Sequence, residues 1–204
     1  MTGIVGLTGA TLPTAPTVCH ECIWWQSPSG RTIDKPRWIR GTEEEWGAWG
    51  TVYYDDDRRL LGSMQYGPSD LFPRAAELPA GPPTEDAVLV TCAYLVDLSK
   101  PWVMQSLFLT AIGDAKKKGA PALEAFAYHY PEGETSYARF RVHRTVFPSD
   151  FLADFGFSSV RSFGPVGLAR LELGGLEPVL EPTREKVIRL VKETLTPAPV
   201  PQQP

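Results

Sequence analysis

Cysteine, basic clusters and long apolar runs are scarce in this sequence, and each shortage excludes a class of protein. Three cysteines are an odd number, which argues against a disulfide framework and predicts a reducing compartment, the cytoplasm. No run of about 18 apolar residues occurs, and residues 1–16 lack the basic start and apolar core of a secretory signal, so no membrane association is expected. Basic residues number 20 against 24 acidic ones and form no basic face, so nucleic acid is not an expected partner.

The remaining composition is that of an ordinary folded protein. Hydrophobic residues make up 43% of the chain and charged residues 22%, which is a globular balance. The 204 residues are enough for one domain with a full core, and we assign that domain to residues 1–178. Residues 179–204 are predicted to form an amphipathic helix, Thr183–Leu195, followed by a tail with four prolines.

The clearest secondary-structure pattern lies in the middle of the chain. Ala87–Val96 is almost wholly apolar and rich in β-branched residues, which predicts a strand buried on both faces. Trp102–Lys118 has apolar residues at helical spacing, lysines in its last turn and Gly119 after it, which predicts a helix. Ala122–Tyr128 has the pattern of the next strand. This strand–helix–strand order predicts an α/β fold with a mixed sheet of about six strands.

Shorter patterns on both sides complete the predicted sheet and its helices. The predicted flanking strands are Ile4–Leu7, Thr51–Tyr54, Leu60–Tyr66, Ser158–Ser162 and Val166–Leu173. The predicted helices are Lys35–Trp49 and Pro148–Phe155, and the proline-rich stretch Gly67–Glu85 is predicted to be a surface loop with a helical turn near Leu71.

Three segments in this order resemble the core of the GNAT superfamily of N-acetyltransferases. The first runs from Cys92 through the central helix to the stretch Gly-Ala-Pro-Ala-Leu-Glu-Ala-Phe that starts at Gly119. The second, Phe151–Phe157, is similar to the family's short helix ending in Gly-Phe, and the third, Gly164–Leu173, to its closing strand. The likeness covers roughly residues 50–173, in order and spacing more than in identities. It implies a mixed, mostly antiparallel central sheet flanked by helices, and transfer of an acetyl group from acetyl-CoA to a small-molecule or protein amine.

The resemblance also implies where acetyl-CoA, the cosubstrate, would bind. The acyl-CoA would lie along the strand at Tyr94, Leu95 and Val96, with its phosphates near the start of the following helix. Unpaired N–H groups and the dipole of a helix start favour such an anion. The binding residues implied there are Ser99, Lys100, Trp102, Val103 and Met104.

Two positions depart from the family pattern. The family's phosphate loop carries glycines that let the backbone approach the phosphates, whereas Ser99–Met104 contains none and Pro101 removes one N–H donor. The tyrosine that protonates the departing thiolate in many members is matched by Leu152, which has no proton to donate. These departures favour an alternative function, that of a non-catalytic binding or regulatory module of the same fold. Lys100 and the intact helix start favour the enzyme, which is our leading hypothesis.

Glu124, on the strand after the central helix, is the candidate general base. In the family such a glutamate sometimes removes the acceptor proton through a water molecule, which requires the carboxylate to reach the amine. The alternative is a solvated charge near an edge of the sheet. Both interpretations of Glu124 stay open at this point.

The N-terminal third holds a cysteine pair and most of the tryptophans. Cys19 and Cys22 have the Cys-x-x-Cys spacing of a metal site, but no second pair follows, so we predict no metal and treat them as small residues near Trp24 and Trp25. Cys92 lies in an apolar strand, where a thiol usually packs as a small hydrophobe. Three roles stay open for the tryptophans: walls of an acceptor pocket, core packing, and the contact of a homodimer.

Overall fold

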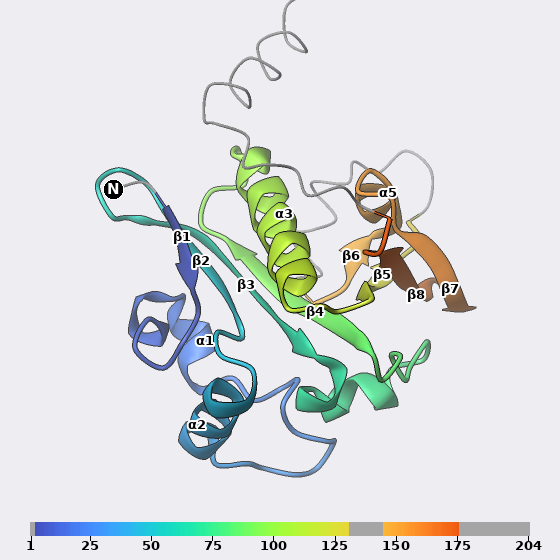
Figure 1. The fold of residues 1–204 in the computed structure, drawn as a ribbon, viewed down its shortest axis with the longest axis horizontal. Coiled ribbons are helices and arrows are strands. Elements are labelled where there is room, and N and C mark those ends of the chain that lie inside the picture. Colours follow the sequence, from blue (N-terminus) through green and yellow to red (C-terminus); the bar gives the residue numbers. More distant parts are fainter. Residues whose placement is uncertain (1–2, 131–144, 176–204) are drawn as a thin grey trace, which may run out of the picture.

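The computed structural model describes residues 3–130 and 145–175, which form helices around one central sheet (Figure 1). The sheet has eight strands, in the order β1-β2-β3-β4-β5-β8-β7, with β6 paired to β5. The pairs β4–β5 and β5–β6 are parallel and the other pairs among the described strands are antiparallel, so the predicted mixed, mostly antiparallel sheet is confirmed. The strands are β1 Gly3–Gly6, β2 Gly50–Tyr54, β3 Leu60–Pro68, β4 Ala87–Leu95, β5 Ala122–Tyr128, β6 Phe147–Pro148, β7 Ser158–Phe163 and β8 Val166–Glu172.

The predicted count of about six strands is too low, although seven of the eight observed strands correspond to predicted segments. Strand β6 has two residues, which is too short for an alternating pattern to show in the sequence. The predicted strands of the core otherwise match the observed ones to within two residues, including β4, whose Val88, Leu89 and Val90 are all buried. A strand that is buried on both faces needs no polar side chain, and the sequence pattern of β4 has none before Thr91.

The helices are α1 Thr17–Glu21, α2 Lys35–Glu45, α3 Pro101–Lys117 and α5 Ser149–Ala153, with 3₁₀ turns η1 Leu12–Thr14, η2 Ser69–Leu71 and η3 Pro73–Glu77. Helix α2 begins at Asp34, whose carboxylate accepts a hydrogen bond from the Arg37 amide at 3.1 Å. It ends before the predicted Trp49, because Gly47 adopts a φ of +88° and Trp49 turns into a cluster with Val52. The five-residue helix α1 is too short to be predicted from periodicity.

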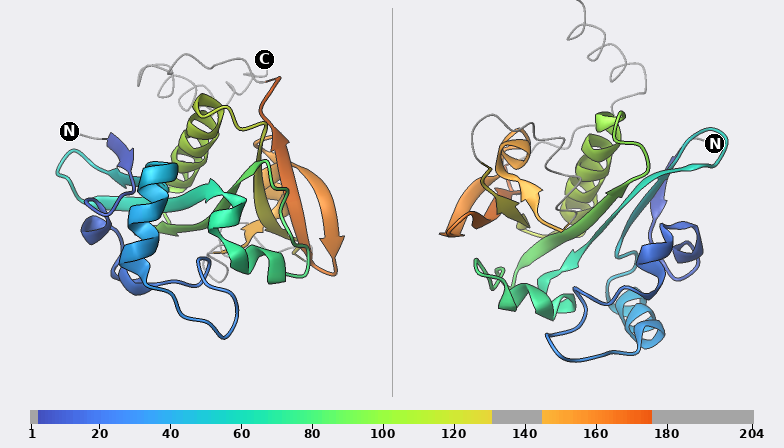
Figure 2. Two further views of the ribbon diagram at one scale, coloured as in Figure 1. Left: turned by 60° about the horizontal axis from the view of Figure 1, so that its bottom comes forward. Right: turned by 180° about the vertical axis from the view of Figure 1, so that it is seen from behind.

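The two faces of the sheet are covered by different helices (Figures 1 and 2). Val52 of β2 packs with Ile39 of α2, whereas the next residue, Tyr53, contacts Trp102 of α3. Because successive side chains of a strand point to opposite faces, α2 and α3 lie on opposite sides of the sheet. The larger part of the core lies under α3, where Leu107 and Phe108 are fully buried.

Two further predictions concern the ends of the chain and membranes. The described helices are too short or too polar to serve as a membrane span. The predicted helix Thr183–Leu195 and the proline-rich tail within residues 179–204 lie outside the described residues.

Candidate functional site

Strands β4 and β5 run side by side over their first halves and then part. Their pairing extends from Ala87 with Ala122 to Val90 with Ala125, although β4 continues to Leu95. A register shift between β3 and β4 leaves Thr91 as an extra residue, and such a bulge bends the strand that carries it. The hydroxyl of Thr91 is buried and donates to the Gln65 side-chain oxygen at 3.0 Å, which holds the bulge in place. The second half of β4 therefore has no pairing with β5, whose end pairs with β6 instead, and we call this divergence of the two strands the cleft.

Backbone groups of β4 face this cleft. The Val96 amide donates to the Leu61 carbonyl of β3 at 3.0 Å. Hydrogen-bonding directions alternate along an antiparallel strand, so Tyr94 also points its N–H and C=O toward β3. The N–H and C=O groups of Ala93 and Leu95 therefore point to the other side, beyond the range where β5 pairs with β4. Of the three predicted strand residues, Leu95 alone turns its main chain into the cleft.

Two of the predicted phosphate-binding groups are held by a carboxylate of the chain itself. The amide and the hydroxyl of Ser99 both donate to Asp97, at 2.9 and 2.7 Å, and the Lys100 ammonium lies 3.7 Å from the same carboxylate. The hydrogen bonds from the Ser99 hydroxyl and amide lower the pKa of Asp97, so this group stays anionic. An anion thus already occupies the loop at which we predicted a pyrophosphate.

The start of α3 lies beside this loop. No side chain caps the helix, Pro101 at its first position has no N–H, and the Val103 amide already donates to the Lys100 carbonyl at 3.1 Å, so the helix start attracts an anion more by its dipole than by free donors. Trp102 is 42% exposed, and its ring packs edge-on against that of Tyr53, with 5.7 Å between the ring centroids. Val103 and Met104 are buried in the core under the helix, so these two predicted binding residues contribute packing rather than side-chain contacts to the site.

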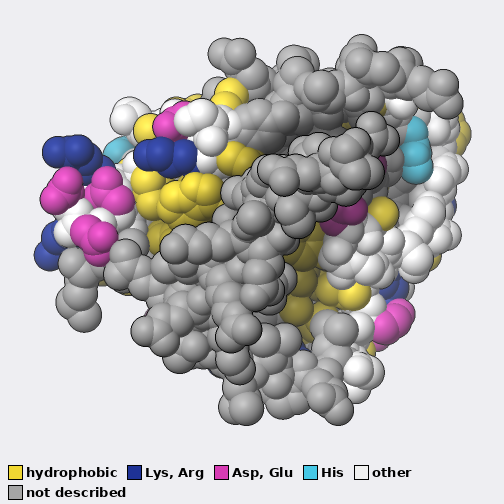
Figure 3. All heavy atoms as spheres, turned by 90° about the horizontal axis from the view of Figure 1, so that it is seen from above, with side chains coloured by type: hydrophobic (Ala, Val, Ile, Leu, Met, Phe, Trp, Pro, Cys, Tyr) yellow, Lys and Arg dark blue, Asp and Glu magenta, His cyan; other side chains and the backbone are white. Residues whose placement is uncertain are grey.

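Apolar side chains are exposed where β4 ends and α3 begins. Val96 is 54% exposed and stands with Trp102 at the end of the molecule where α3 begins. Figure 3 looks onto that end and shows apolar side chains on either side of the residues drawn in grey. Apolar walls with a few polar groups are typical of small-molecule sites.

Glu124 lies far from the cleft. It faces Leu89 of β4, six residues before Leu95, which places it about 20 Å along the strand from the end of β4. Its carboxylate is fully buried and accepts hydrogen bonds from the Thr84 amide at 2.9 Å, from the Thr84 hydroxyl, and from Arg170 of β8 at 3.1 Å. These contacts are those of a structural ion pair, and neither predicted role, base or solvated charge, fits this placement.

Leu152 is buried, and phenylalanines fix the helix that carries it. The ring centroid of Phe108 in α3 lies 5.0 Å from that of Phe147 in β6 and 5.2 Å from that of Phe151 in α5, so α5 and β6 pack against α3. Leu152 itself is 1% exposed. The residue that matches the family's acid is therefore part of the core, and α5 presents no proton donor at that position.

The cysteine pair surrounds a buried lysine. The Lys35 ammonium donates to the Cys19 carbonyl and, at 2.6 Å, to the Cys22 carbonyl, and burial lowers the pKa of this lysine. Burial raises the pKa of Cys92 to about 12, which leaves its thiol protonated and a poor nucleophile. Among the residues that the structure describes, no three His, Cys, Asp or Glu side chains gather closely enough to hold a metal ion.

Sequence reasoning missed Asp97 and the bulge at Thr91. A polar residue just after an apolar strand is an ordinary loop residue, so nothing in the sequence marks Asp97 as the partner of Ser99 and Lys100. A threonine inside an otherwise apolar strand is a weak signal of the bulge. The donors at Ala93 and Leu95 are main-chain N–H groups, and no residue type in the sequence identifies such a group.

No protein-family model matches this chain, and no curated protein matches it by sequence. One solved structure with a similar fold is an N-acetyltransferase from Staphylococcus aureus, 14% identical, with a TM-score of 0.48 over 85% of this chain and 99% of that chain. A second is the ribosomal-protein alanine N-acetyltransferase from Escherichia coli, 10% identical, with a TM-score of 0.46 over 88% and 99%. A third is a GCN5-related N-acetyltransferase from Kribbella flavida, 13% identical, with a TM-score of 0.46 over 84% and 98%. Likeness at this level carries no conclusion about chemistry, so the function proposed below depends on the geometry of this chain.

Proposed function

We propose that the protein is an N-acyltransferase that moves an acetyl group from acetyl-CoA to a small-molecule or protein amine. One observation carries the proposal: β4 and β5 pair only as far as Val90, and the backbone groups of Ala93 and Leu95 point to the side of β4 on which β5 no longer pairs. A pantetheine arm carries amide groups that can pair with such a strand as a second strand would. The start of α3, which no side chain caps, lies at the same end of β4, and its dipole favours a phosphate.

The chemistry needs positioning more than reactive side chains. The amine nitrogen attacks the carbonyl carbon of the thioester, the carbonyl oxygen becomes an oxyanion, and the C–S bond then breaks to release the thiolate. The amine loses one proton to water and the thiolate takes one up, so the proton count balances. In this scheme an N–H of Ala93 or Leu95 donates to the oxyanion, and the cleft holds the two reactants together.

The second candidate is a non-catalytic module that binds a ligand in the same cleft. It is favoured by Asp97, whose carboxylate holds Ser99 and Lys100, and by the buried Leu152 in the place of an acid. Such a module would bind a thioester or another apolar ligand without transferring its acyl group.

Calorimetric titration with acetyl-CoA tests the proposal. We expect micromolar to millimolar binding that weakens about fivefold in Lys100→Ala, because one ammonium near a phosphate contributes roughly 1 kcal/mol at an exposed position. Lys117→Ala, at the far end of α3, is the matched control and is expected to bind as the wild type does. Absence of binding at millimolar acetyl-CoA would exclude the acetyltransferase.

If acetyl-CoA binds, release of free CoA thiol with a panel of amines decides between the two candidates. Thiol release that depends on one class of amine supports the enzyme. Binding without thiol release for any amine supports the non-catalytic module.

A further inference from the structure

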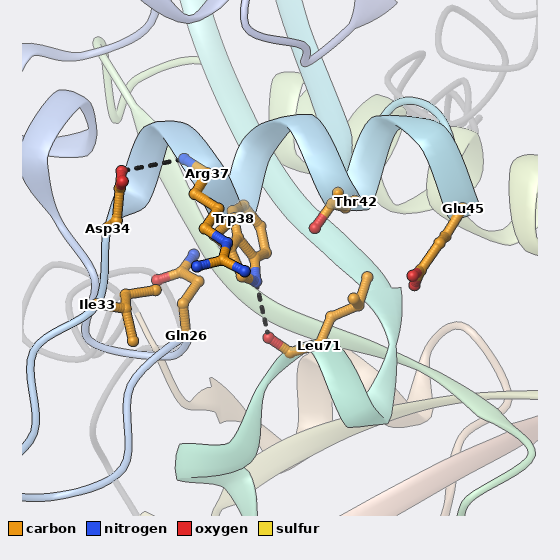
Figure 4. A pocket seen from close by; sticks show the side chains of 9 residues that line it. Gln26, Ile33, Asp34, Arg37, Trp38, Thr42, Glu45 and Leu71 are labelled. Atoms are coloured by element: carbon orange, nitrogen blue, oxygen red, sulfur yellow. Dashed lines mark hydrogen bonds between the residues drawn. The ribbon is translucent and has the colours of Figure 1, made fainter.

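A cavity lies beside α2, on the face of the sheet opposite α3. Its volume is about 490 Å³, within the usual range for a small-molecule site. One face of α2 forms one wall, and Figure 4 shows the side chains that line it. Ile33 and Leu71 supply apolar surface opposite the helix, and Trp38 is fixed there by a hydrogen bond from its indole N–H to the Leu71 carbonyl at 3.3 Å.

Two buried polar side chains border this cavity without a partner. Gln26 is 5% exposed and Thr42 is 2% exposed. Within residues 3–130 and 145–175, neither the side-chain oxygen of Gln26 nor the hydroxyl of Thr42 has a hydrogen-bond partner. Buried polar atoms are rarely left unpaired, because the loss of water is then uncompensated. Both residues line the same cavity, and this makes a ligand that donates hydrogen bonds a suitable occupant.

Charges of both signs stand along the same wall. Arg37 and Glu45 are exposed, lie eight residues apart on α2 and so are separated by about 12 Å of helix. The described part of the chain offers neither of them an ion pair. Asp34 also borders the cavity, but one of its carboxylate oxygens accepts from the Arg37 amide.

We propose that this cavity binds a small zwitterion of dipeptide size, with its carboxylate at Arg37 and its ammonium at Glu45. An arginine fork pairs with a carboxylate through two hydrogen bonds, and a glutamate pairs with an ammonium. The peptide N–H between them is a donor for Thr42 or Gln26, and an apolar side chain would lie on Trp38. A phosphate ligand is disfavoured by the two carboxylates, and a purely apolar ligand would leave the buried oxygens unpaired. The site is independent of the proposed acyl transfer, since α2 covers the face of the sheet opposite α3.

Titration with alanyl-leucine, followed by calorimetry and tryptophan fluorescence, tests the assignment. We expect the free dipeptide to bind, and its N-acetylated form and its C-terminal amide each to bind at least about tenfold more weakly, because each lacks one charge. Arg37→Gln and Glu45→Gln should weaken the free dipeptide by a similar factor. Arg40→Gln removes a charge from the same helix outside the cavity and should leave the affinity unchanged.

The variant Thr42→Val tests whether the Thr42 hydroxyl binds a ligand or stabilises the fold. Valine has nearly the shape of threonine without the unpaired hydroxyl, so the melting temperature of the free protein should rise while dipeptide affinity falls. A lower melting temperature would show that the hydroxyl has a structural partner. Equal binding of the free and blocked dipeptides, or no binding of any at millimolar concentration, would overturn the proposal.

Discussion

Replacement of Glu124 by glutamine distinguishes a structural carboxylate from a catalytic one. The amide keeps the size of the side chain and an acceptor for the Thr84 N–H, but it loses the charge that pairs with Arg170 at 3.1 Å. Breaking a buried ion pair costs roughly 3–5 kcal/mol. In this variant Arg170 still has Glu172 at 2.6 Å and Asp86 at 3.4 Å, so its charge remains paired. We therefore expect a loss near the lower end, about 3 kcal/mol, or about 6–12 °C in melting temperature for a domain of this size.

Urea denaturation and acetyl-CoA titration of the same Glu124→Gln sample form the assay. Glu172→Gln is the matched control, since it removes a carboxylate from the same arginine at a position that is 69% exposed. An exposed pair contributes less than about 1 kcal/mol, so the control should stay close to the wild type. Acetyl-CoA affinity should be unchanged in both variants, because Glu124 is about 20 Å from the end of β4. Normal stability of Glu124→Gln together with lost acyl transfer would refute the structural role and restore the general base.

Three further predictions follow from other contacts. Tyr66→Phe removes the 2.6 Å hydrogen bond to Asp114 and should cost about 1.5–3 kcal/mol at neutral pH. Burial and this hydrogen bond raise the pKa of Tyr66 above its ordinary 10.0. The unfolded state therefore loses the Tyr66 proton at a lower pH than the folded state does, and wild-type stability falls as the pH rises above 10. The difference in free energy of unfolding between the two proteins, measured by urea denaturation, should therefore narrow by about 1 kcal/mol between pH 10 and 11, and a constant difference would contradict this. Iodoacetamide should label exposed Cys22 at least about a hundredfold faster than the partly exposed Cys92, by peptide mass spectrometry, because desolvation raises the pKa of Cys92 to about 12; equal rates would contradict the raised pKa. Asp97→Asn should strengthen acetyl-CoA binding about threefold by removing a charge that repels phosphate, and weaker binding would show that Asp97 organises the loop for its ligand.

Most of the fold could be predicted because its elements are locally consistent. Helix α3 has a proline at its start, lysines in its last turn and Gly119 at a φ of +77° after its end, so three independent signals give the same boundaries. Strand β4 is predictable from its apolar run alone. The end of α2 was predicted wrongly, because the helical spacing of Trp46 and Trp49 continues past the point where Gly47 turns the chain. There the burial of Trp49 in another cluster overrides the local pattern.

The candidate site was less predictable, because its parts depend on contacts between distant segments. The charge on Glu124 fitted a general base as long as its partner was unknown, and that partner, Arg170, is 46 residues away in the sequence. Lys35 is a similar case, since a lysine at the start of a helix is an ordinary surface residue until Cys19 and Cys22 turn their carbonyls toward it. A titratable residue is assigned a role by its neighbours, and a single sequence does not reveal neighbours across a sheet.

The parting of β4 from β5 shows why this cleft in particular has no signature in the sequence. A parallel pair normally stays in register, and the pair does so from Ala87 to Val90. One extra residue, Thr91, then interrupts the register of β4 with β3, and the hydrogen bond of its buried hydroxyl to Gln65 satisfies that polar group. The groups that are left without a β5 partner are the amides of Ala93 and Leu95, whose side chains carry no chemistry. A site built from main-chain donors tolerates the loss of glycines and of a tyrosine elsewhere, since the strand and its bulge supply the geometry. The proposed acyl transfer is therefore compatible with a loop that departs from the family pattern, provided that the cleft itself is kept.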